Sequence, residues 1–436
     1  MDQLPRKLGL FDAAAIVIGI VIGSGIFLLP NLIARSVASG AAIIAIWIAG
    51  GVLSYFGALA YAELGAMNPA TGGQYVYLRD AFGPLCGFLC GWVFVLAVIP
   101  GGIAFLAVGF SIYLAQFLAM SAVTAKLVSV ALVLLLSAVN YVGVREAAWV
   151  QRVFTGLKIG GLAVLIVACF AGPHVSRRAP EHAVTYGGIG FATTLVLMAY
   201  NGWSYVSFVA GEVKDPQRNI PRALAMGMGA VMLLYIGANL GYMNVLSLDQ
   251  IASAERVGAT AAGRAMGPVG AAFISVTVLM SVTAAINGCI LTGSRIPFAQ
   301  ARDGLFFRKF ATVHPRFQTP SFAIVVQAVW SVVVLLTGSY ENLSSYSILP
   351  AWVFYSMCVL AVLVLRRKTP QASRPYRMWG YPVTMWLFLA VSVWFIGDAL
   401  VTQTGTSLIA LGVAASGIPV YFFHRRGQLR FENKAA

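Results

Sequence analysis

Side chains that could carry out chemistry are few in this 436-residue chain, and none stands in a catalytic arrangement. The sequence contains no H-E-x-x-H or G-x-S-x-G motif, and no two histidines have the spacing of metal ligands. The glycine-rich loop that cradles nucleotide phosphates is also missing. All four histidines lie in predicted loops or in the C-terminal tail: His174, His182, His314 and His424. We therefore expect a protein that is not an enzyme, uses no cofactor or metal and is not driven by ATP.

Clusters of glycine, serine and asparagine interrupt two apolar segments. The first is residues 19–27 (GIVIGSGIF) and the second is residues 199–204 (AYNGWS). Glycine inside a helix costs up to about 1 kcal/mol relative to alanine, so each cluster weakens its helix. A helix broken at membrane depth frees backbone N–H and C=O groups that can bind a polar substrate. The alternative role of Gly19 and Gly23, which form a GxxxG pair, is to let two helices pack closely.

Lys158 is a charged residue within an apolar segment, at residues 156–160 (GLKIG). A charged side chain at membrane depth is costly, so it indicates a functional role by default. The alternative is that Lys158 lies close enough to the start of its helix to reach the membrane surface with its long side chain.

The other charges near the predicted spans are less specific. Asp12 and Glu63 lie near span ends, where capping or interfacial roles are expected. For Asp398 we expect a helix contact or an oligomer contact. Arginines that could close the cytoplasmic side with Glu212 or Asp303, or could simply face lipid, are Arg145, Arg295 and Arg302.

The elements that must position these residues are transmembrane helices. Hydrophobic residues make up 59% of the chain and charged residues only 10%, whereas a soluble domain carries about 25% charged residues. Lipid explains the excess, because lipid-facing positions must be apolar as well as the core. We predict about twelve spans, close to residues 11–34, 41–64, 84–117, 127–142, 151–171, 188–211, 222–247, 269–298, 321–338, 345–365, 382–401 and 405–423.

The two interrupted spans are the first and the sixth, which is the pattern of a transporter built from two inverted repeats. We therefore predict an all-α polytopic membrane protein with a five-plus-five inverted repeat, followed by two appended helices. The repeats cover about residues 11–171 and 188–365, and the appended helices cover about residues 382–423. Together they form a single transmembrane domain.

The formal net charge of +15 predicts orientation in the membrane. Most Lys and Arg residues fall in the loops on the side of the two termini, which the positive-inside rule places in the cytoplasm. We expect a multi-pass protein of the cell's inner (plasma) membrane whose basic loops contact anionic lipid and not nucleic acid. The cysteines lie in or beside apolar spans, where a disulfide framework is not expected: Cys86, Cys90, Cys169, Cys289 and Cys358.

Several short motifs occur in an order and spacing that resembles a known family. They begin with residues 23–27 (GSGIF), 61–65 (YAELG), 72–77 (GGQYVY), 199–203 (AYNGW), 211–216 (GEVKDP) and 219–221 (NIP). They continue with residues 287–288 (NG), 294–295 (SR), 301–304 (ARDG), 314–315 (HP), 319–320 (TP) and 374–375 (RP). The chain resembles the amino acid–polyamine–organocation superfamily, and within it the bacterial L-type amino acid transporter branch. The resemblance implies a five-plus-five fold that works by alternating access.

The resemblance also implies roles for residues of the two interrupted spans. The substrate carboxylate is expected at the backbone amides of Gly23, Ser24 and Gly25, which a helix N-terminus would present to an anion. The substrate ammonium is expected at the carbonyls of Val21, Met198 and Asn201.

The expected side-chain pocket departs from the family pattern at two positions. Met198 stands where the family usually places an aromatic gate, so Trp203 or Tyr200 is expected to close the site instead. Asn201 stands where bacterial relatives often carry aspartate, which weakens the expectation of a cationic substrate.

Lys158 occupies the region where sodium-coupled relatives bind their ion, so the resemblance implies sodium-independent transport with Lys158 as the coupling residue. We expect an exchanger of neutral amino acids. The alternative is a proton-coupled amino acid symporter, and a polyamine or cationic amino acid carrier is less favoured. The loop near residues 118–126 lacks the cysteine that animal relatives use to bind a heavy chain, so no covalent partner is expected. The oligomeric state is not predicted.

Overall fold

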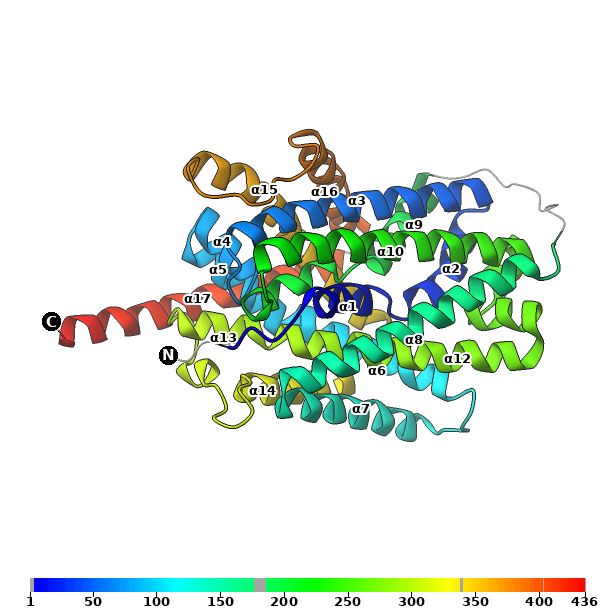
Figure 1. Ribbon diagram of the computed structural model, residues 1–436, viewed down its shortest axis with the longest axis horizontal. Coiled ribbons are helices and arrows are strands. Elements are labelled where there is room, and N and C mark those ends of the chain that lie inside the picture. The colour runs from blue at the N-terminus through cyan, green and yellow to red at the C-terminus, as the bar shows by residue number, and fades with distance from the viewer. Residues whose placement is uncertain (1–3, 176–185, 338–339, 403, 436) are drawn as a thin grey trace.

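The structure, a computed structural model, describes residues 4–175, 186–337, 340–402 and 404–435. Within these residues the fold is helical, and extended pairing is limited to an isolated bridge between Leu8 and Val213. The long helices run roughly along one common axis, and the two ends of the chain lie at the same end of the bundle (Figure 1).

The chain enters the bundle through α1 and returns across it many times. The first elements are α1 (Leu10–Val21), α2 (Gly25–Ser36), α3 (Gly40–Met67), α4 (Gln74–Phe82), α5 (Pro84–Val93), η1 (Phe94–Val98), α6 (Ile99–Leu114), α7 (Ala122–Val142) and α8 (Val144–Ala171). The remaining elements are α9 (Tyr186–Ala199), η2 (Trp203–Glu212), α10 (Pro216–Val245), α11 (Leu248–Ser253), α12 (Val257–Gly293), α13 (Arg295–Arg302), η3 (Arg308–Ala311), α14 (Ser321–Thr337), α15 (Tyr340–Lys368), α16 (Val383–Thr402) and α17 (Thr404–Ala435).

Ten helical stretches among the described residues are long and apolar enough to cross a membrane. The apolar helix α14 is shorter, with 17 residues. The sixth predicted span is divided between α9, with 14 residues, and η2, with 10 residues. Each of the predicted spans therefore has a helical counterpart, and the prediction of an all-α polytopic membrane protein is confirmed.

Both predicted helix breaks are present. The first span stops at Val21 and resumes at Gly25. The sixth span stops at Ala199 and, after a turn, continues as the 3₁₀ helix η2. The two breaks touch, because a Cβ atom added at Gly202 would lie only 2.6 Å from Cγ2 of Ile20.

The predicted starts of at least three spans were too late. Helices α7, α8 and α10 begin at Ala122, Val144 and Pro216, several residues before the apolar stretches that predicted them. Each added stretch contains charged side chains, because a helix continues past the hydrocarbon boundary while hydropathy detects only the part inside it. Helix α12 bends at Gly267, where φ is 73°, and the stretch after this bend coincides with the predicted span.

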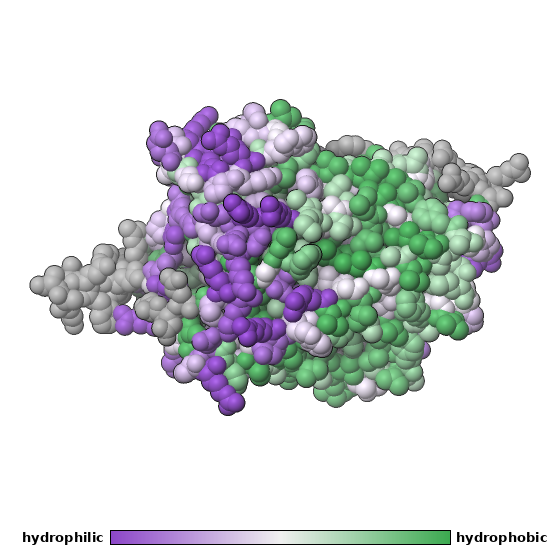
Figure 2. Space-filling model, in the orientation of Figure 1, coloured by the Kyte–Doolittle hydropathy of each residue, from purple (hydrophilic) through white to green (hydrophobic). Residues whose placement is uncertain are grey.

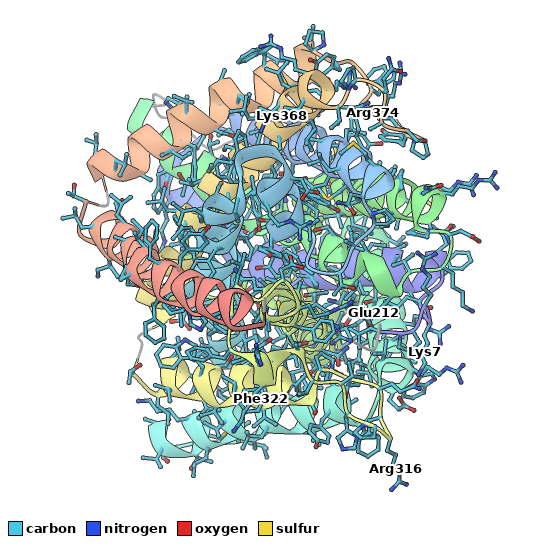
Figure 3. The ribbon with its side chains drawn as sticks, turned by 90° about the vertical axis from the view of Figure 1, so that its left-hand side faces the viewer. Lys7, Glu212, Arg316, Phe322, Lys368 and Arg374 are labelled. Atoms are coloured by element: carbon cyan, nitrogen blue, oxygen red, sulfur yellow. The ribbon has the colours of Figure 1, made fainter. Side chains whose placement is uncertain are left out.

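The surface is divided into a broad apolar band and polar ends. Figure 2 shows hydrophilic side chains gathered toward the end that holds the termini, with hydrophobic side chains over most of the remaining length. Large apolar side chains of the band are exposed, including Leu233 at 75% and Val393 at 71%. The polar end, viewed directly in Figure 3, carries the basic residues Lys7, Arg316 and Arg374. This surface fits a helix bundle solvated by lipid.

Candidate substrate site at the two helix breaks

The break in the first span leaves backbone N–H groups without acceptors. The amides of Phe27 and Leu28 donate to the Ser24 carbonyl, at 3.1 and 3.2 Å. The amides of Ser24 and Gly25 have no hydrogen-bond acceptor within the part of the chain that the structure describes. They stand at the N-terminus of α2, whose positive dipole end favours an anion. This junction can therefore bind a carboxylate.

The break in the sixth span depends on a glycine. Gly202 has a φ of 115°, a left-handed conformation that L side chains rarely adopt, and the N–H of Tyr205 donates to its carbonyl at 3.2 Å. The following helix η2 has three residues per turn, so Gly202 and Tyr205 lie on the same face. That face lines a cavity shared with the first break.

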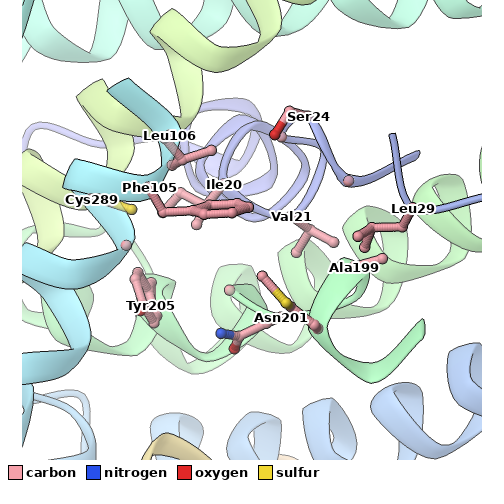
Figure 4. Close-up of a pocket in the computed structure, with 15 residues that line it drawn as sticks. Ile20, Val21, Ser24, Leu29, Phe105, Leu106, Ala199, Asn201, Tyr205 and Cys289 are labelled. Carbon is pink, nitrogen blue, oxygen red and sulfur yellow. The ribbon is translucent and has the colours of Figure 1, made fainter. Parts of the chain in front are cut away.

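A cavity of about 100 Å³ lies between the two breaks and α6 (Figure 4). A cavity needs roughly 10–15 Å³ of volume to hold one water molecule, so this cavity is large enough for a small organic molecule. None of its lining residues carries a charged side chain. The lining consists of Ile20, Val21, Gly23, Ser24, Gly25, Leu29, Gly102, Phe105, Leu106, Met198, Ala199, Asn201, Gly202, Tyr205 and Cys289.

Two polar side chains at the cavity differ in their hydrogen bonding. The Ser24 side chain is 1% exposed, and its hydroxyl has no partner among the described residues. Asn201 is held in place, because its Oδ1 accepts a hydrogen bond from the Tyr355 hydroxyl at 2.8 Å. The unpaired Ser24 hydroxyl is a group that a polar ligand would satisfy.

Six of the seven predicted substrate residues line this cavity together: Val21, Gly23, Ser24, Gly25, Met198 and Asn201. Trp203 does not line it. Its ring is fully buried and packs 5.0 Å from Tyr61 and 5.3 Å from Tyr355, measured between ring centroids. Tyr200 packs instead against Trp47 and Tyr235. The aromatic side chains in the lining are those of Phe105 and Tyr205.

The backbone groups at the first break are not equally available. The Gly23 amide donates to the Val21 carbonyl at 2.9 Å, and the Tyr235 hydroxyl lies 2.9 Å from the same oxygen. The Val21 oxygen thus already accepts one hydrogen bond and lies within reach of the hydroxyl proton that Tyr235 shares between Val21 and Ala199. The neighbouring Ile20 carbonyl accepts no hydrogen bond within the described residues and also belongs to a cavity-lining residue. Among the carbonyls at this break, Ile20 is therefore the better candidate acceptor for an ammonium group.

The Tyr235 hydroxyl connects the two breaks. It lies 2.9 Å from the Val21 oxygen and 3.2 Å from the Ala199 oxygen, and its side chain is fully buried. Sequence reasoning missed Tyr235, because nothing in its local sequence marks it and both partners are distant along the chain.

Lys158 does not reach the membrane surface. Its side chain is fully buried, and its Nζ donates to the carbonyls of Gly19 at 2.8 Å, Ile22 at 2.6 Å and Ser281 at 2.8 Å. All three ammonium hydrogens are therefore used. The snorkelling alternative is wrong: Lys158 ties α8 and α12 to the broken end of α1. Its role in coupling stays a prediction.

Several of the other charged residues that the sequence singled out form ion pairs at or near the ends of helices. Arg295 holds Glu212 with two hydrogen bonds, of 2.8 and 3.0 Å, and both side chains are fully buried. Asp303 pairs with Arg79, and Glu63 pairs with Arg366. Asp12 accepts a hydrogen bond from the Gly9 amide at 2.8 Å, which confirms its capping role. Of the arginines proposed to close the cytoplasmic side, Arg295 is the one found with Glu212.

Two broken helices around an uncharged cavity are the arrangement expected of a secondary transporter. The amino acid permease family model matches residues 8–418, so the chain belongs to the amino acid permease family. This confirms the resemblance to the amino acid–polyamine–organocation superfamily.

Three curated relatives extend over nearly the whole chain. The serine/threonine exchanger SteT of Bacillus subtilis (strain 168) is 33% identical over 97% of both chains. The large neutral amino acids transporter small subunit 2 of Rattus norvegicus is 32% identical over 96% of this chain and 80% of its own. The Asc-type amino acid transporter 1 of Mus musculus is 32% identical over 96% of this chain and 81% of its own.

Proposed function

We propose that this protein exchanges small neutral amino acids across the cell membrane by alternating access. The observation that carries the proposal is the cavity between the two helix breaks, where free backbone amides face an uncharged lining. An amino acid supplies matching groups, since its carboxylate fits the amides and its ammonium fits carbonyl oxygens that still have a lone pair to offer.

The substrate carboxylate would bind the amides of Ser24 and Gly25, beside the unpaired Ser24 hydroxyl. The ammonium would bind carbonyls across the cavity, at Ile20, Met198 and Asn201. In this scheme Gly23 contributes space, because its amide already donates to Val21. Each charged group of the substrate then receives hydrogen bonds that replace those lost from water.

The side chain of the substrate would be neutral and small. A cationic side chain would need a carboxylate partner, and the lining contains none. The volume of about 100 Å³ and the contacts of Phe105, Leu106 and Tyr205 limit the size of the side chain. The names of the relatives, a serine/threonine exchanger and a large neutral amino acids transporter among them, support a neutral substrate but do not fix its size.

Exchange is favoured over proton-coupled uptake because one full-length relative, SteT, is named an exchanger. Sodium independence is proposed because the Lys158 ammonium already holds the Gly19, Ile22 and Ser281 carbonyls, which a cation would otherwise be drawn to. The same contacts support Lys158 as the coupling residue between α8 and the moving parts of α1.

We also propose that both termini lie in the cytoplasm and that the carrier needs no covalent partner. The concentration of basic residues at the end that holds the termini supports this orientation (Figure 3). One relative is named a small subunit, but residues 118–126 of this chain contain no cysteine that could form a link to a larger one. The division into repeats at about residues 11–171 and 188–365 remains part of the proposal, supported by the matching breaks.

The test is uptake of radiolabelled serine, alanine or leucine into proteoliposomes without sodium, with or without unlabelled amino acid inside. Exchange requires that internal amino acid accelerates uptake strongly at both pH 6 and pH 8. Uptake into empty vesicles that depends on an inward proton gradient would establish the symporter instead. Uptake confined to arginine, lysine or polyamines would contradict the neutral substrate class.

A further inference from the structure

A stripe of polar side chains on α8 faces α1. Gln151, Thr155 and Lys158 are spaced by four and three residues, so they share one helix face, and all are at least 97% buried. Lys158 binds α1 carbonyls at the break. Gln151 Nε2 and Thr155 Oγ1 lie 3.2 and 3.3 Å from the Ala15 oxygen, one turn earlier on α1. Helix α8 therefore holds the α1 backbone at two levels.

Gln151 also connects α1 to two other helices. Its Oε1 accepts a hydrogen bond from Asn287 Nδ2 of α12 at 2.9 Å. The Oδ1 of Asn287 in turn accepts from Asn140 Nδ2 of α7 at 2.9 Å. All three amides are 0–1% exposed. One chain of side-chain amides thus joins α1 to α8, α12 and α7 in the interior of the protein.

The side-chain amide of Gln151 packs against two glycines from different helices, Gly19 and Gly288. A Cβ atom added at Gly19 of α1 would lie 2.0 Å from Gln151 Nε2. One added at Gly288 of α12 would lie 2.5 Å from Ile20 and 3.3 Å from the same nitrogen. Both positions must be glycine for α1, α12 and the amide to meet. Gly19 therefore has the packing role that its GxxxG pair allows. The Asn287-Gly288 pair of the sequence motif is explained as well, since Asn287 bonds the Gln151 amide and Gly288 leaves room for it.

We propose that Gln151 is a positioning residue for the exchange cycle: it fixes the first half of α1 against α12 and α7 and so sets how readily α1 moves. This inference rests on the proposed function. Apolar contacts, such as that of Val17 with Gly227, tolerate sliding because they are not directional. The amide hydrogen bonds are directional, and in a buried site they are costly to leave unmade. They are retained only while α1 stays in place.

The first test measures α1 directly, in purified protein in lipid nanodiscs. The variant is Gln151→Met, which keeps the length of the side chain and removes its hydrogen bonds. The matched control is Gln300→Met, which removes a buried glutamine that bonds the Phe88 carbonyl at 2.9 Å and does not contact α1. Hydrogen–deuterium exchange of residues 10–21 should become several-fold faster in Gln151→Met and should not change in the control.

The milder variant Thr155→Val removes the second donor to Ala15 and should shift residues 10–21 in the same direction by a smaller amount. It keeps the test decisive if Gln151→Met does not fold. The proposal would be overturned if hydrogen–deuterium exchange of residues 10–21 were unchanged in folded Gln151→Met. If Gln151→Met does not fold, the same result in Thr155→Val would overturn it. So would equal acceleration in the Gln300→Met control.

The second test is the half-saturation constant for substrate on each side of oriented proteoliposomes. Release of α1 changes the balance between the two open states, so KM should change by about threefold or more on one side and in the opposite sense on the other. A lower maximal rate with both KM values unchanged would show a merely structural role and overturn the proposal. Absence of exchange by the wild-type protein would refute the proposed function, while the deuterium measurement would still decide the role of Gln151.

Discussion

Removing one partner of the buried Glu212–Arg295 pair should harm the protein more than removing both. The guanidinium holds the carboxylate with two hydrogen bonds of 2.8 and 3.0 Å, and neither side chain is exposed. Arg295→Met leaves a carboxylate buried without a counter-charge, which costs about 3–5 kcal/mol. Glu212→Leu leaves the guanidinium in the same position, with only the Ser294 hydroxyl at 3.0 Å.

The double variant Glu212→Leu/Arg295→Met contains no buried charge at this site. Replacing both members of such a pair by apolar residues is often neutral or stabilising by about 1–4 kcal/mol, so most of the stability should return. The matched control is Arg152→Met, because Arg152 is 51% exposed in its 3.0 Å pair with Asp12. An exposed pair contributes only about 0–1 kcal/mol.

The assay is the temperature at which each purified variant loses its monodisperse peak after heating in detergent. The expected order, from least to most stable, places both single variants below the double variant, which lies near Arg152→Met and wild type. Single variants as stable as Arg152→Met would refute the reasoning, because they would show that the pair is solvated in the protein. A double variant less stable than either single variant would refute it as well.

Three further predictions concern the substrate site. Gly25→Leu should lower amino acid exchange at least about tenfold without preventing membrane insertion, because its Cβ would lie 3.3 Å from Leu29 and the side chain would block the free amides. The control is Gly229→Ala, whose Cβ would meet nothing within 4 Å. Normal exchange by Gly25→Leu would exclude the carboxylate site. Lys158→Met should reduce exchange severely, since three carbonyls lose their donor, and an unchanged rate would exclude a coupling role. Asn201→Asp should increase competition by arginine and lysine against labelled serine, unless this side chain does not face the substrate.

The helix breaks and the spans were predictable because their causes are local. Glycine clusters weaken a helix wherever they occur, so residues 19–27 and 199–204 showed where the breaks would form. The apolar stretches revealed the membrane segments for the same reason. Hydropathy could not locate the start of α8 at Val144, because its first turn contains the charged residues Arg145 and Glu146.

The sequence predicted the cavity-lining residues of the two helix breaks but not the aromatic side chains of the lining, Phe105 and Tyr205. Trp203 was expected in the site, but the 3₁₀ geometry of η2 brings Tyr205 into line with Gly202 and leaves Trp203 against Tyr61. A sequence pattern assumes 3.6 residues per turn and cannot show where the period changes to three. For Phe105, the signal in the sequence was Gly102, which lies one helical turn earlier on α6 and also lines the cavity.

Long-range polar contacts could not be predicted. Gln151 meets Ala15 and Asn287, each about 136 residues away along the chain, and Tyr235 meets Val21 across 214 residues. Such pairs depend on how helices pack, and a single sequence carries no record of it. The sequence offered Arg145, Arg295 and Arg302 equally as partners for Glu212, and only the packing of α13 selects Arg295.

The most direct test of the central claim is an experimental structure of the protein with a bound neutral amino acid such as serine. We predict density in the cavity between the helix breaks, with the carboxylate about 3 Å from the amide nitrogens of Ser24 and Gly25. The ammonium should face the carbonyls of Ile20, Met198 or Asn201. An amino acid bound elsewhere, with these amides unoccupied, would contradict the account.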